Sequence, residues 1–149
     1  MLVYRISLAR FGNNLLASGR AARWNPNDVK MIYTASSRSL ACLENVVHRN
    51  RAGLTDIFNI MTIACPEDLK IKTIPVSGLP DNWADYDQMY LTQRMGETWI
   101  RGNSSAILEV PSSIVEGEVN YLLNPEHADF KKITIIKTQL FVFDKRIKG

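Results

Sequence analysis

The sequence predicts an α+β fold, a single compact domain over residues 1–149 in which helices flank a mixed β-sheet. The length of 149 residues fits one hydrophobic core. Hydrophobic residues make up 46% of the chain and charged residues 22%, a balance typical of a globular protein and not of a disordered one. Segments with strand character outnumber those with helix character and do not alternate regularly with them. This pattern favours a mixed sheet over repeated βαβ units.

A long polar loop separates the first two predicted strands. Residues 2–7 alternate as a short strand does, and residues 29–35 have the apolar run of a buried strand. Between them, residues 10–28 contain glycine, asparagine and proline in combinations that form turns. A loop of this length in a small domain is usually functional, so we expect it to contribute to a site.

The first helix is predicted directly after the second strand. Ser36 or Ser37 can cap it, because a serine oxygen accepts a hydrogen bond from an N-terminal backbone N–H, and the helical pattern extends to about residue 49. Its expected apolar stripe consists of Leu40, Leu43 and Val47. Cys42 lies in this helix and Cys65 ends a later apolar strand, so we expect both as reduced core residues.

The rest of the chain is predicted to contain one more helix and several strands. Residues 81–99 have helical character, with Asp81 as an N-cap and Gly96 as an interruption that can divide the helix in two. Strands are expected at residues 57–64, 70–76, 106–110 and 133–144, the last as one long strand or two short ones, and residues 121–123 precede a turn at Asn124-Pro125.

Charge and motifs exclude several classes of function. The net charge of +3 is below the density that argues for a nucleic-acid binder. The chain has no P-loop, no dinucleotide-binding glycine fingerprint and no zinc motif, and His48 and His127 alone cannot form a zinc site, so we expect no metal. It shows no signal peptide and no apolar segment long enough to span a membrane, so a cytoplasmic protein is expected.

Glu44 is the most unusual residue of the first predicted helix. It lies beside Leu43 and one turn after Leu40, so its side chain borders the apolar face, where an unpaired carboxylate is costly. One interpretation is a boundary residue paired with Arg38 or His48. The other is a catalytic carboxylate in the wall of a pocket.

Arginine, tyrosine and serine supply the remaining candidate site residues. Arg23 and Trp24 place a planar cation next to an indole in the long loop, which suits a phosphate and a flat base, although such pairs also pack on plain surfaces. Arg5 can point inward to a pyrophosphate or outward to water. Tyr33 is a core aromatic or lies near the anion-binding N-terminus of the first helix, and Ser112 on its own is a turn serine.

Seven segments in a fixed order carry a resemblance to a known family. They are Tyr4-Arg5-Ile6, Ala22-Arg23-Trp24-Asn25-Pro26, Ile32-Tyr33-Thr34-Ala35, Ser39-Leu40-Ala41-Cys42-Leu43-Glu44 with Val47-His48, Val110-Pro111-Ser112-Ser113-Ile114, Asn120-Tyr121-Leu122-Leu123-Asn124-Pro125 and His127-Ala128-Asp129-Phe130. Together they resemble the RES domain family, named for an arginine, a glutamate and a serine. One departure, Ala21-Ala22 in place of two glycines, bears on the shape of the pocket rim.

The resemblance implies a fold similar to that of ADP-ribosyltransferase toxins and an enzyme that breaks the nicotinamide–ribose bond of NAD+. NAD+ is then a consumed substrate and not a cofactor, and water or inorganic phosphate is the acceptor. The family's members are usually encoded beside an Xre-like helix-turn-helix antitoxin that covers the active site. The implied partners are therefore NAD+ and this antitoxin, with no membrane and no nucleic acid except through the antitoxin.

The resemblance also implies a role for each matching residue. Arg5 and Arg23 would hold the pyrophosphate, with Trp24 beside them in the binding site, and Tyr33 would pack against the nicotinamide or its ribose. Glu44 would bind that ribose and stabilise positive charge as the bond breaks, and Ser112 would position a ribose hydroxyl or the nicotinamide amide. Arg5, Tyr33, Glu44 and Ser112 are the expected catalytic residues. Nicotinamide leaves as a neutral molecule, so the chemistry needs neither a metal nor a strong acid.

Two other functions remain open at this point. The fold kinship allows an ADP-ribosyltransferase that modifies a protein or a nucleic acid. The basic residues allow an RNA-directed toxin or a nucleic-acid module, which would bind with a strong dependence on salt and would not consume NAD+.

Overall fold

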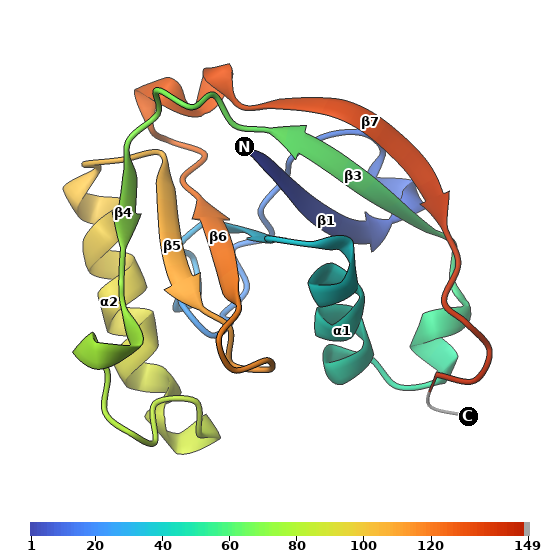
Figure 1. Ribbon diagram of the computed structural model, residues 1–149, viewed down its shortest axis with the longest axis horizontal. Helices are drawn as coiled ribbons and strands as arrows, with labels where there is room; N and C mark the ends of the chain where they lie inside the picture. The colour runs from blue at the N-terminus through green and yellow to red at the C-terminus, as the bar shows by residue number, and fades with distance from the viewer. Residues whose placement is uncertain (148–149) are drawn as a thin grey trace.

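The computed structural model describes residues 1–147 and has one seven-stranded sheet with two α-helices among those residues (Figure 1). The strands are β1 (Leu2–Leu8), β2 (Ile32–Ala35), β3 (Phe58–Ala64), β4 (Ile71–Thr73), β5 (Ile107–Pro111), β6 (Val119–Leu123) and β7 (Thr134–Phe141), and the helices are α1 (Arg38–His48) and α2 (Met89–Gly102). The strand order is β4-β5-β6-β2-β1-β3-β7, with β4 and β5 parallel and all other neighbours antiparallel. The predicted α+β class with a mixed sheet is confirmed.

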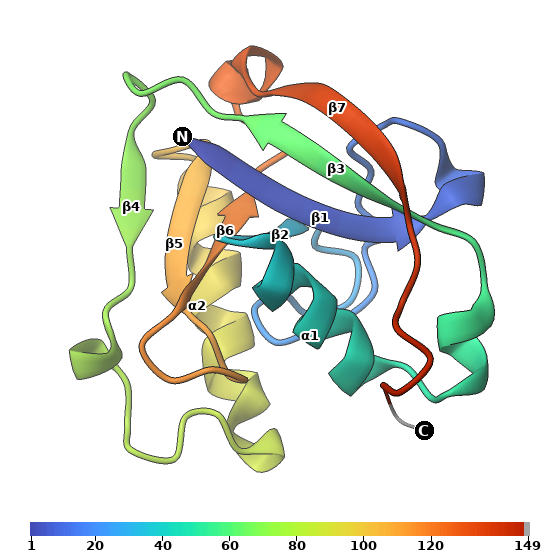
Figure 2. The same ribbon diagram turned by 45° about the vertical axis from the view of Figure 1, so that its right-hand side comes forward.

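The sheet is nearly divided between β1 and β2. β1 pairs with β3 along its whole length, from Leu2 opposite Ala64 to Leu8 opposite Phe58, whereas β1 and β2 are paired only where Tyr4 faces Ala35. Two half-sheets, β4-β5-β6-β2 and β1-β3-β7, therefore diverge from this seam, and α1 lies against β1 and β2 beside it (Figures 1 and 2).

Each half-sheet has its own hydrophobic packing. α2 covers one face of β5 and β6, where Trp99 packs with a buried cluster that includes Trp24 and Trp83, whose ring centroids are 6.0 Å apart. α1 packs through Leu40 and Ala41 on a second cluster that includes side chains from β1 and β3. The apolar surface removed from water on both sides is what stabilises a sheet with so little pairing at its centre.

The cap of α1 is confirmed, and its predicted apolar stripe is right at Leu40 but wrong at Leu43 and Val47. The Ser37 hydroxyl accepts a hydrogen bond from Leu40 N at 3.1 Å, as an N-cap does. Leu40 is fully buried, while Leu43 and Val47 are 41% and 53% exposed. The reason is that the small Ala41, not Leu43, faces the sheet beside Leu40 and lets the helix approach it closely.

Three predicted boundaries also differ from the structure. β2 begins at Ile32 and not at residue 29, because Asp28 has a positive φ of 70° and the Val29 N–H donates to Pro26 O in a turn. β4 ends at Thr73, two residues before Pro75, and β7 is one strand that ends at Phe141.

Cys42 and Cys65 are both free thiols, half-buried and buried respectively, and burial raises the pKa of each.

α2 begins eight residues later than predicted and continues through Gly96. Asp81 does not cap it; the helix starts at Met89 after a short 3-10 turn, η4 (Tyr86–Gln88). The carbonyls of residues 83–85 accept hydrogen bonds from Arg23, and of these three only Asp85 O also accepts a helical hydrogen bond, from Gln88 N in η4. In the described part of the chain, residues 1–147, no helix has the length and apolar character needed to cross a membrane.

Gly96 is a contact point and not an interruption. A Cβ placed on Gly96 would lie 1.7 Å from the carbonyl oxygen of Trp24, so only glycine allows the helix to touch this segment of backbone. One turn earlier, the Thr92 hydroxyl donates to Arg23 O, and Gln93 Nε2 donates to Ala22 O at 2.9 Å. α2 thereby fixes the backbone of residues 22–24.

We predict that Gly96→Ala lowers the free energy of unfolding by about 1–3 kcal/mol, because the new methyl group overlaps a backbone oxygen that cannot move without breaking these contacts. The matched control is Gly102→Ala in the same helix, where a Cβ meets nothing within 4 Å and should stabilise by up to ~1 kcal/mol. Urea unfolding measures both changes. Equal effects of the two variants would show that the close approach is not required.

Candidate active site

A cleft of about 750 Å³ opens along the seam between the half-sheets. Its walls come from β1 and β2, from one face of α1, from residues 21–24 of the long loop, and from η4 with the start of α2. Arg5, Arg23, Trp24, Tyr33 and Glu44 all line it, so segments far apart in the sequence meet here. The prediction that the long loop contributes to a site agrees with this placement.

Arg5 points into the cleft from β1 and is largely buried. Its Nη1 donates to Tyr33 O at 2.8 Å and its Nη2 to Leu16 O at 3.4 Å. No carboxylate pairs with it among residues 1–147, and burial lowers the pKa of its guanidinium. Arginine nonetheless remains protonated in proteins. A buried cation without a counter-ion favours an anionic ligand.

Arg23 is held differently, by three consecutive carbonyl groups. Its Nη2 donates to Ala84 O at 2.9 Å, and its Nη1 to Asp85 O at 3.2 Å and Trp83 O at 3.4 Å. Burial lowers the pKa of its guanidinium, while the nearby Tyr33 and Asp85 act in the opposite direction. The guanidinium therefore fastens residues 83–85 to the wall of the cleft and leaves Nε for a further acceptor.

Tyr33 contributes its ring to the cleft, while its hydroxyl group is already occupied. The hydroxyl donates to Asn25 Oδ1 at 2.5 Å and accepts from Trp24 N at 3.0 Å. Burial raises the pKa of this hydroxyl well above its usual value, so the phenol stays neutral. Asn25 is itself buried, and its Nδ2 bonds Arg20 O and Val29 O. Tyr33 thus ties β2 to the long loop instead of reaching the N-terminus of α1.

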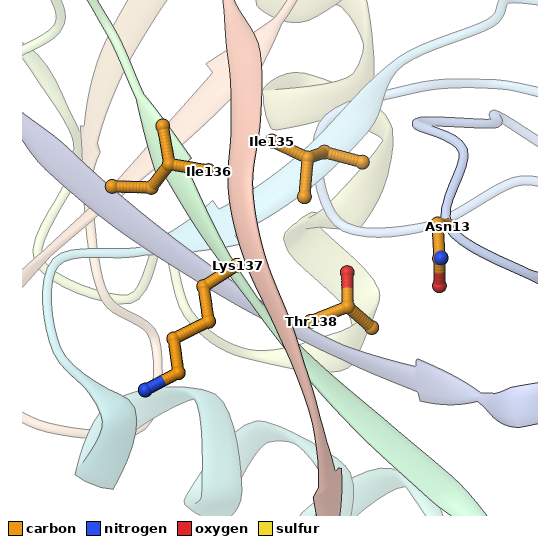
Figure 3. Close-up of a pocket in the computed structure, with 5 residues that line it drawn as sticks. All are labelled: Asn13, Ile135, Ile136, Lys137 and Thr138. Carbon is orange, nitrogen blue, oxygen red and sulfur yellow. The ribbon is translucent and has the colours of Figure 1, made fainter.

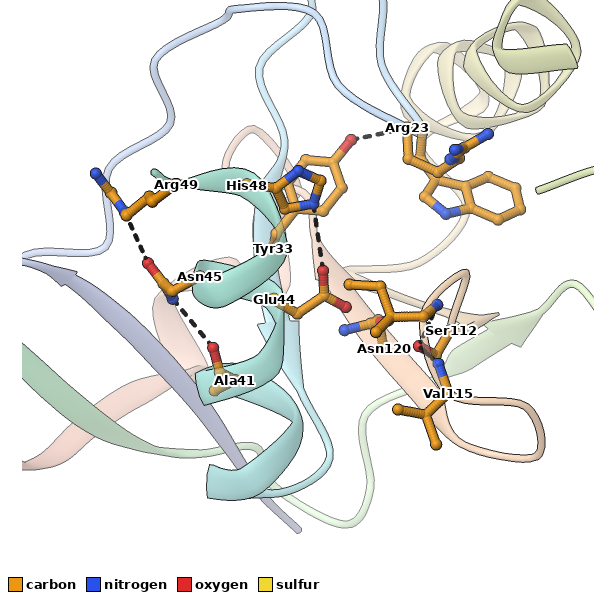
Figure 4. A network of polar contacts seen from close by, with 12 residues as sticks. Arg23, Tyr33, Ala41, Glu44, Asn45, His48, Arg49, Ser112, Val115 and Asn120 are labelled. Atoms are coloured by element: carbon orange, nitrogen blue, oxygen red, sulfur yellow. Dashed lines mark hydrogen bonds and ion pairs between the residues drawn. The ribbon is translucent and has the colours of Figure 1, made fainter. Parts of the chain in front are cut away.

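Glu44 is the only carboxylate among the residues that line the cleft. It lies on α1 with His48 Nε2 3.6 Å from its Oε2, so both interpretations of the sequence apply: the residue is paired, and it is also in the wall of a pocket (Figure 4). Beside it, Asn45 Oδ1 accepts from Arg49 Nε at 3.0 Å, and its Nδ2 donates to Ala41 O at 3.0 Å. Arg38, the other expected partner of Glu44, instead lies over the ring of Tyr4.

Ser112 and Trp24 lie at the cleft, but Ser112 is not part of its lining and Trp24 exposes little of its side chain to it. The Ser112 hydroxyl accepts from the N–H groups of Ile114 and Val115 at 3.1 and 3.0 Å, which forms a turn after β5, and Ser113 lines the cleft in its place. The side chain of Trp24 is only 3% exposed and packs against Trp83. Both residues shape the walls of the cleft in this structure.

Two further residues of the cleft were not predicted as site residues from the sequence. Asn120 lies buried within β6, and its Nδ2 donates to Thr34 O at 3.2 Å. An asparagine beside the apolar Tyr121-Leu122-Leu123 run was the available signal, because amides are rare within strands. Tyr86 lines the cleft from η4, and nothing in its local sequence distinguishes it.

A second hollow, of about 300 Å³, lies at the edge strand β7 (Figure 3). Ile135 and Thr138 point toward Asn13 on one side, and Ile136 and Lys137 point to the other. Lys137 is the only ionisable residue in its lining, so this hollow lacks the groups that catalysis requires.

The RES domain profile matches residues 2–144. The chain belongs to the RES domain family. Its relatives include "Toxin Res" of Yersinia enterocolitica, 34% identical over 99% of this chain and 100% of that protein, and "Prs ADP-ribosylating toxin" of a Sphingobium strain, 36% identical over 84% of this chain and 79% of that protein. The chain is thus a RES-family toxin, as its sequence predicted.

A solved structure shares the fold of this RES domain. It is the Mycobacterium tuberculosis MbcT–MbcA toxin–antitoxin complex, with a TM-score of 0.74, 18% identity, and coverage of 95% of this chain and 84% of that one. At this identity the likeness concerns the arrangement of helices and strands.

We predict that Tyr33→Phe destabilises this RES domain by about 1–3 kcal/mol, because the Asn25 carbonyl and the Trp24 N–H lose their buried partner. Tyr90→Phe, on the exposed side of α2, is the control and should change the free energy of unfolding by less than about 0.5 kcal/mol. Chemical denaturation measures both. A Tyr33→Phe protein as stable as the original would show that these bonds do not hold the loop to β2.

Proposed function

We propose that this RES domain cleaves the nicotinamide–ribose bond of NAD+. The observation that carries the proposal is the arrangement of charge in the cleft. Its only carboxylate, Glu44, shares the cleft with Arg5 and Arg23, neither of which forms an ion pair with a carboxylate within residues 1–147. NAD+ has a matching pattern, with a cationic nicotinamide ring at one end and an anionic pyrophosphate in the middle.

The bond that breaks joins the nicotinamide nitrogen to C1 of the ribose. Its electron pair leaves with nicotinamide, which becomes neutral, and positive charge develops on the ribose ring. The carboxylate of Glu44 stabilises that charge most strongly where water is excluded. The acceptor, water or inorganic phosphate, then bonds to C1; water loses a proton and yields ADP-ribose, and phosphate yields ADP-ribose phosphate.

The other site residues position the substrate under this proposal. Arg5 holds the pyrophosphate, because it is the more deeply buried of the two arginines and has only neutral partners. Arg23 Nε adds to this site, and the Tyr33 ring forms the wall beside the nicotinamide ribose. Trp24 supports the backbone of Arg23, and Ser112 acts by shaping the turn that presents Ser113 to the cleft.

We also propose that the chain is the toxin of a toxin–antitoxin pair. The fold neighbour is a toxin from a toxin–antitoxin complex, and the resemblance found in the sequence implies an Xre-like antitoxin that covers the active site. The natural setting of this activity is the cytoplasm, where both NAD+ and the antitoxin are present.

ADP-ribosyl transfer to a macromolecule is the second candidate. It is favoured by the 36% identical relative that is named an ADP-ribosylating toxin. The bond that breaks and the role of Glu44 are the same, and only the acceptor differs. NAD+ labelled in its adenosine part separates the two, since transfer leaves label on a macromolecule and cleavage leaves it on a small product.

We predict that the purified protein consumes NAD+ and that Glu44→Gln lowers the rate about 10²- to 10³-fold, because the glutamine keeps the size of the side chain but not its charge. Mass spectrometry of reactions with and without inorganic phosphate identifies the acceptor. Product formed only with phosphate indicates phosphorolysis, and ADP-ribose formed without it indicates hydrolysis.

Glu97→Gln is the matched control for this variant. Glu97 is also a helical glutamate paired at i+4, with Arg101 at 2.8 Å, but it does not line the cleft. Both variants should retain their stability to within about 0.5 kcal/mol, and only Glu44→Gln should lose activity. Full turnover by Glu44→Gln would remove Glu44 from the mechanism.

A further inference from the structure

Tyr86 is a large aromatic residue that lines the cleft and yet is 85% exposed. It lies at the start of η4, at the rim opposite α1. No other aromatic ring or cation packs on it among residues 1–147. An unpartnered flat ring at the mouth of a cleft is available to stack on a flat ligand.

The backbone that leads into Tyr86 is held in place. Arg23 bonds the carbonyls of the three residues that precede it, and the side chain of Trp83 is buried against Trp24. On the other side, Gln88 N donates to Asp85 O at 3.0 Å, and α2 begins at Met89. A ring on a fixed segment of backbone loses less conformational freedom when it binds a ligand than a ring on a mobile loop would.

We propose that Tyr86 is the stacking surface for the adenine base of the substrate and that Arg23 is the positioning residue that holds it there. The inference rests on the proposed function and names the part of NAD+ that this wall of the cleft receives. Under the proposed function the bond that breaks lies at Glu44, the only carboxylate of the cleft lining. Adenine takes no part in the reaction, so it can occupy the exposed rim.

Neighbouring side chains suit a flat base at this position. Met89 and Gln93 follow Tyr86 along α2 and also line the cleft. A methionine thioether packs well on aromatic rings. Gln93 is fixed by its Nε2 bond to Ala22 O, so its carbonyl oxygen is available as an acceptor for an amino group.

The test compares ligands with and without adenine by isothermal titration calorimetry. ADP-ribose and nicotinamide mononucleotide are titrated into the original protein, Tyr86→Ala and Tyr86→Phe. We expect Tyr86→Ala to weaken ADP-ribose binding about 5- to 150-fold, the range that stacking of one base supports. Tyr86→Phe keeps the ring and should bind ADP-ribose within about twofold of the original protein. Nicotinamide mononucleotide should bind all three proteins equally.

Tyr90→Ala is the matched control, since Tyr90 lies on α2 close to Tyr86 in sequence and is 62% exposed, but it does not line the cleft. Equal losses of affinity for ADP-ribose and nicotinamide mononucleotide in Tyr86→Ala would overturn the proposal, because they would show that the ring contacts a part that both ligands contain. Unchanged ADP-ribose affinity in Tyr86→Ala would remove Tyr86 from the site. ADP-ribose binding that depends on Tyr86 without NAD+ turnover would support this inference and contradict the proposed function.

A double-mutant cycle tests the role of Arg23. If Arg23 acts mainly through Tyr86, then Arg23→Ala weakens ADP-ribose binding more in the original protein than in Tyr86→Ala, where only the contact of its Nε with the pyrophosphate remains to be lost. If Arg23 contacts the pyrophosphate as its main role, the two losses multiply. Multiplied losses would leave Tyr86 as the stacking surface and would overturn the positioning role of Arg23.

Discussion

The candidate site depends on one feature of backbone pairing, the seam between β1 and β2. These neighbouring strands meet at a single residue pair, Tyr4 and Ala35. A full antiparallel ladder here would close the sheet over the space that the cleft occupies and would place Arg5 beside a paired strand. Because the ladder stops, Arg5 has only the carbonyls of Tyr33 and Leu16 as partners, and its charge faces the cleft. The cleft and the charge of Arg5 within it therefore both result from the short pairing between β1 and β2.

A sheet that is open at its centre needs support from elsewhere, and α2 provides it on one side. Gly96 touches Trp24 O, and the side chains of Thr92 and Gln93 bond the carbonyls of Arg23 and Ala22. Tyr33 and Asn25 then connect this segment to β2. The polar groups of a long irregular loop are thus satisfied by one helix and one strand, as buried backbone requires. These bonds hold the wall of the cleft to α2 and β2.

The sequence predicted those features of the fold that depend on local patterns. The mixed sheet and the cap at Ser37 follow from alternation and helix-capping chemistry. The ordered resemblance selected Arg5, Tyr33 and Glu44, which line one cleft in the structure. The late start of α2 could not be predicted, because it depends on an arginine about 60 residues away that binds the carbonyls of residues 83–85. Gly96 was misinterpreted for the same reason, since a glycine that breaks a helix and one that permits a contact look alike in sequence.

Arg23 shows that matching a family motif does not by itself define the role of a residue in the structure. The resemblance implies an arginine that binds pyrophosphate, and an arginine is present in the wall of the cleft. In the structure, however, both of its terminal nitrogens bond backbone carbonyls, and those bonds position the segment that carries Tyr86. Loss of activity on replacing Arg23 would follow from either role. Arg5 also bonds two backbone carbonyls, but it is the more deeply buried of the two arginines, so its charge is the stronger source of attraction for an anionic substrate.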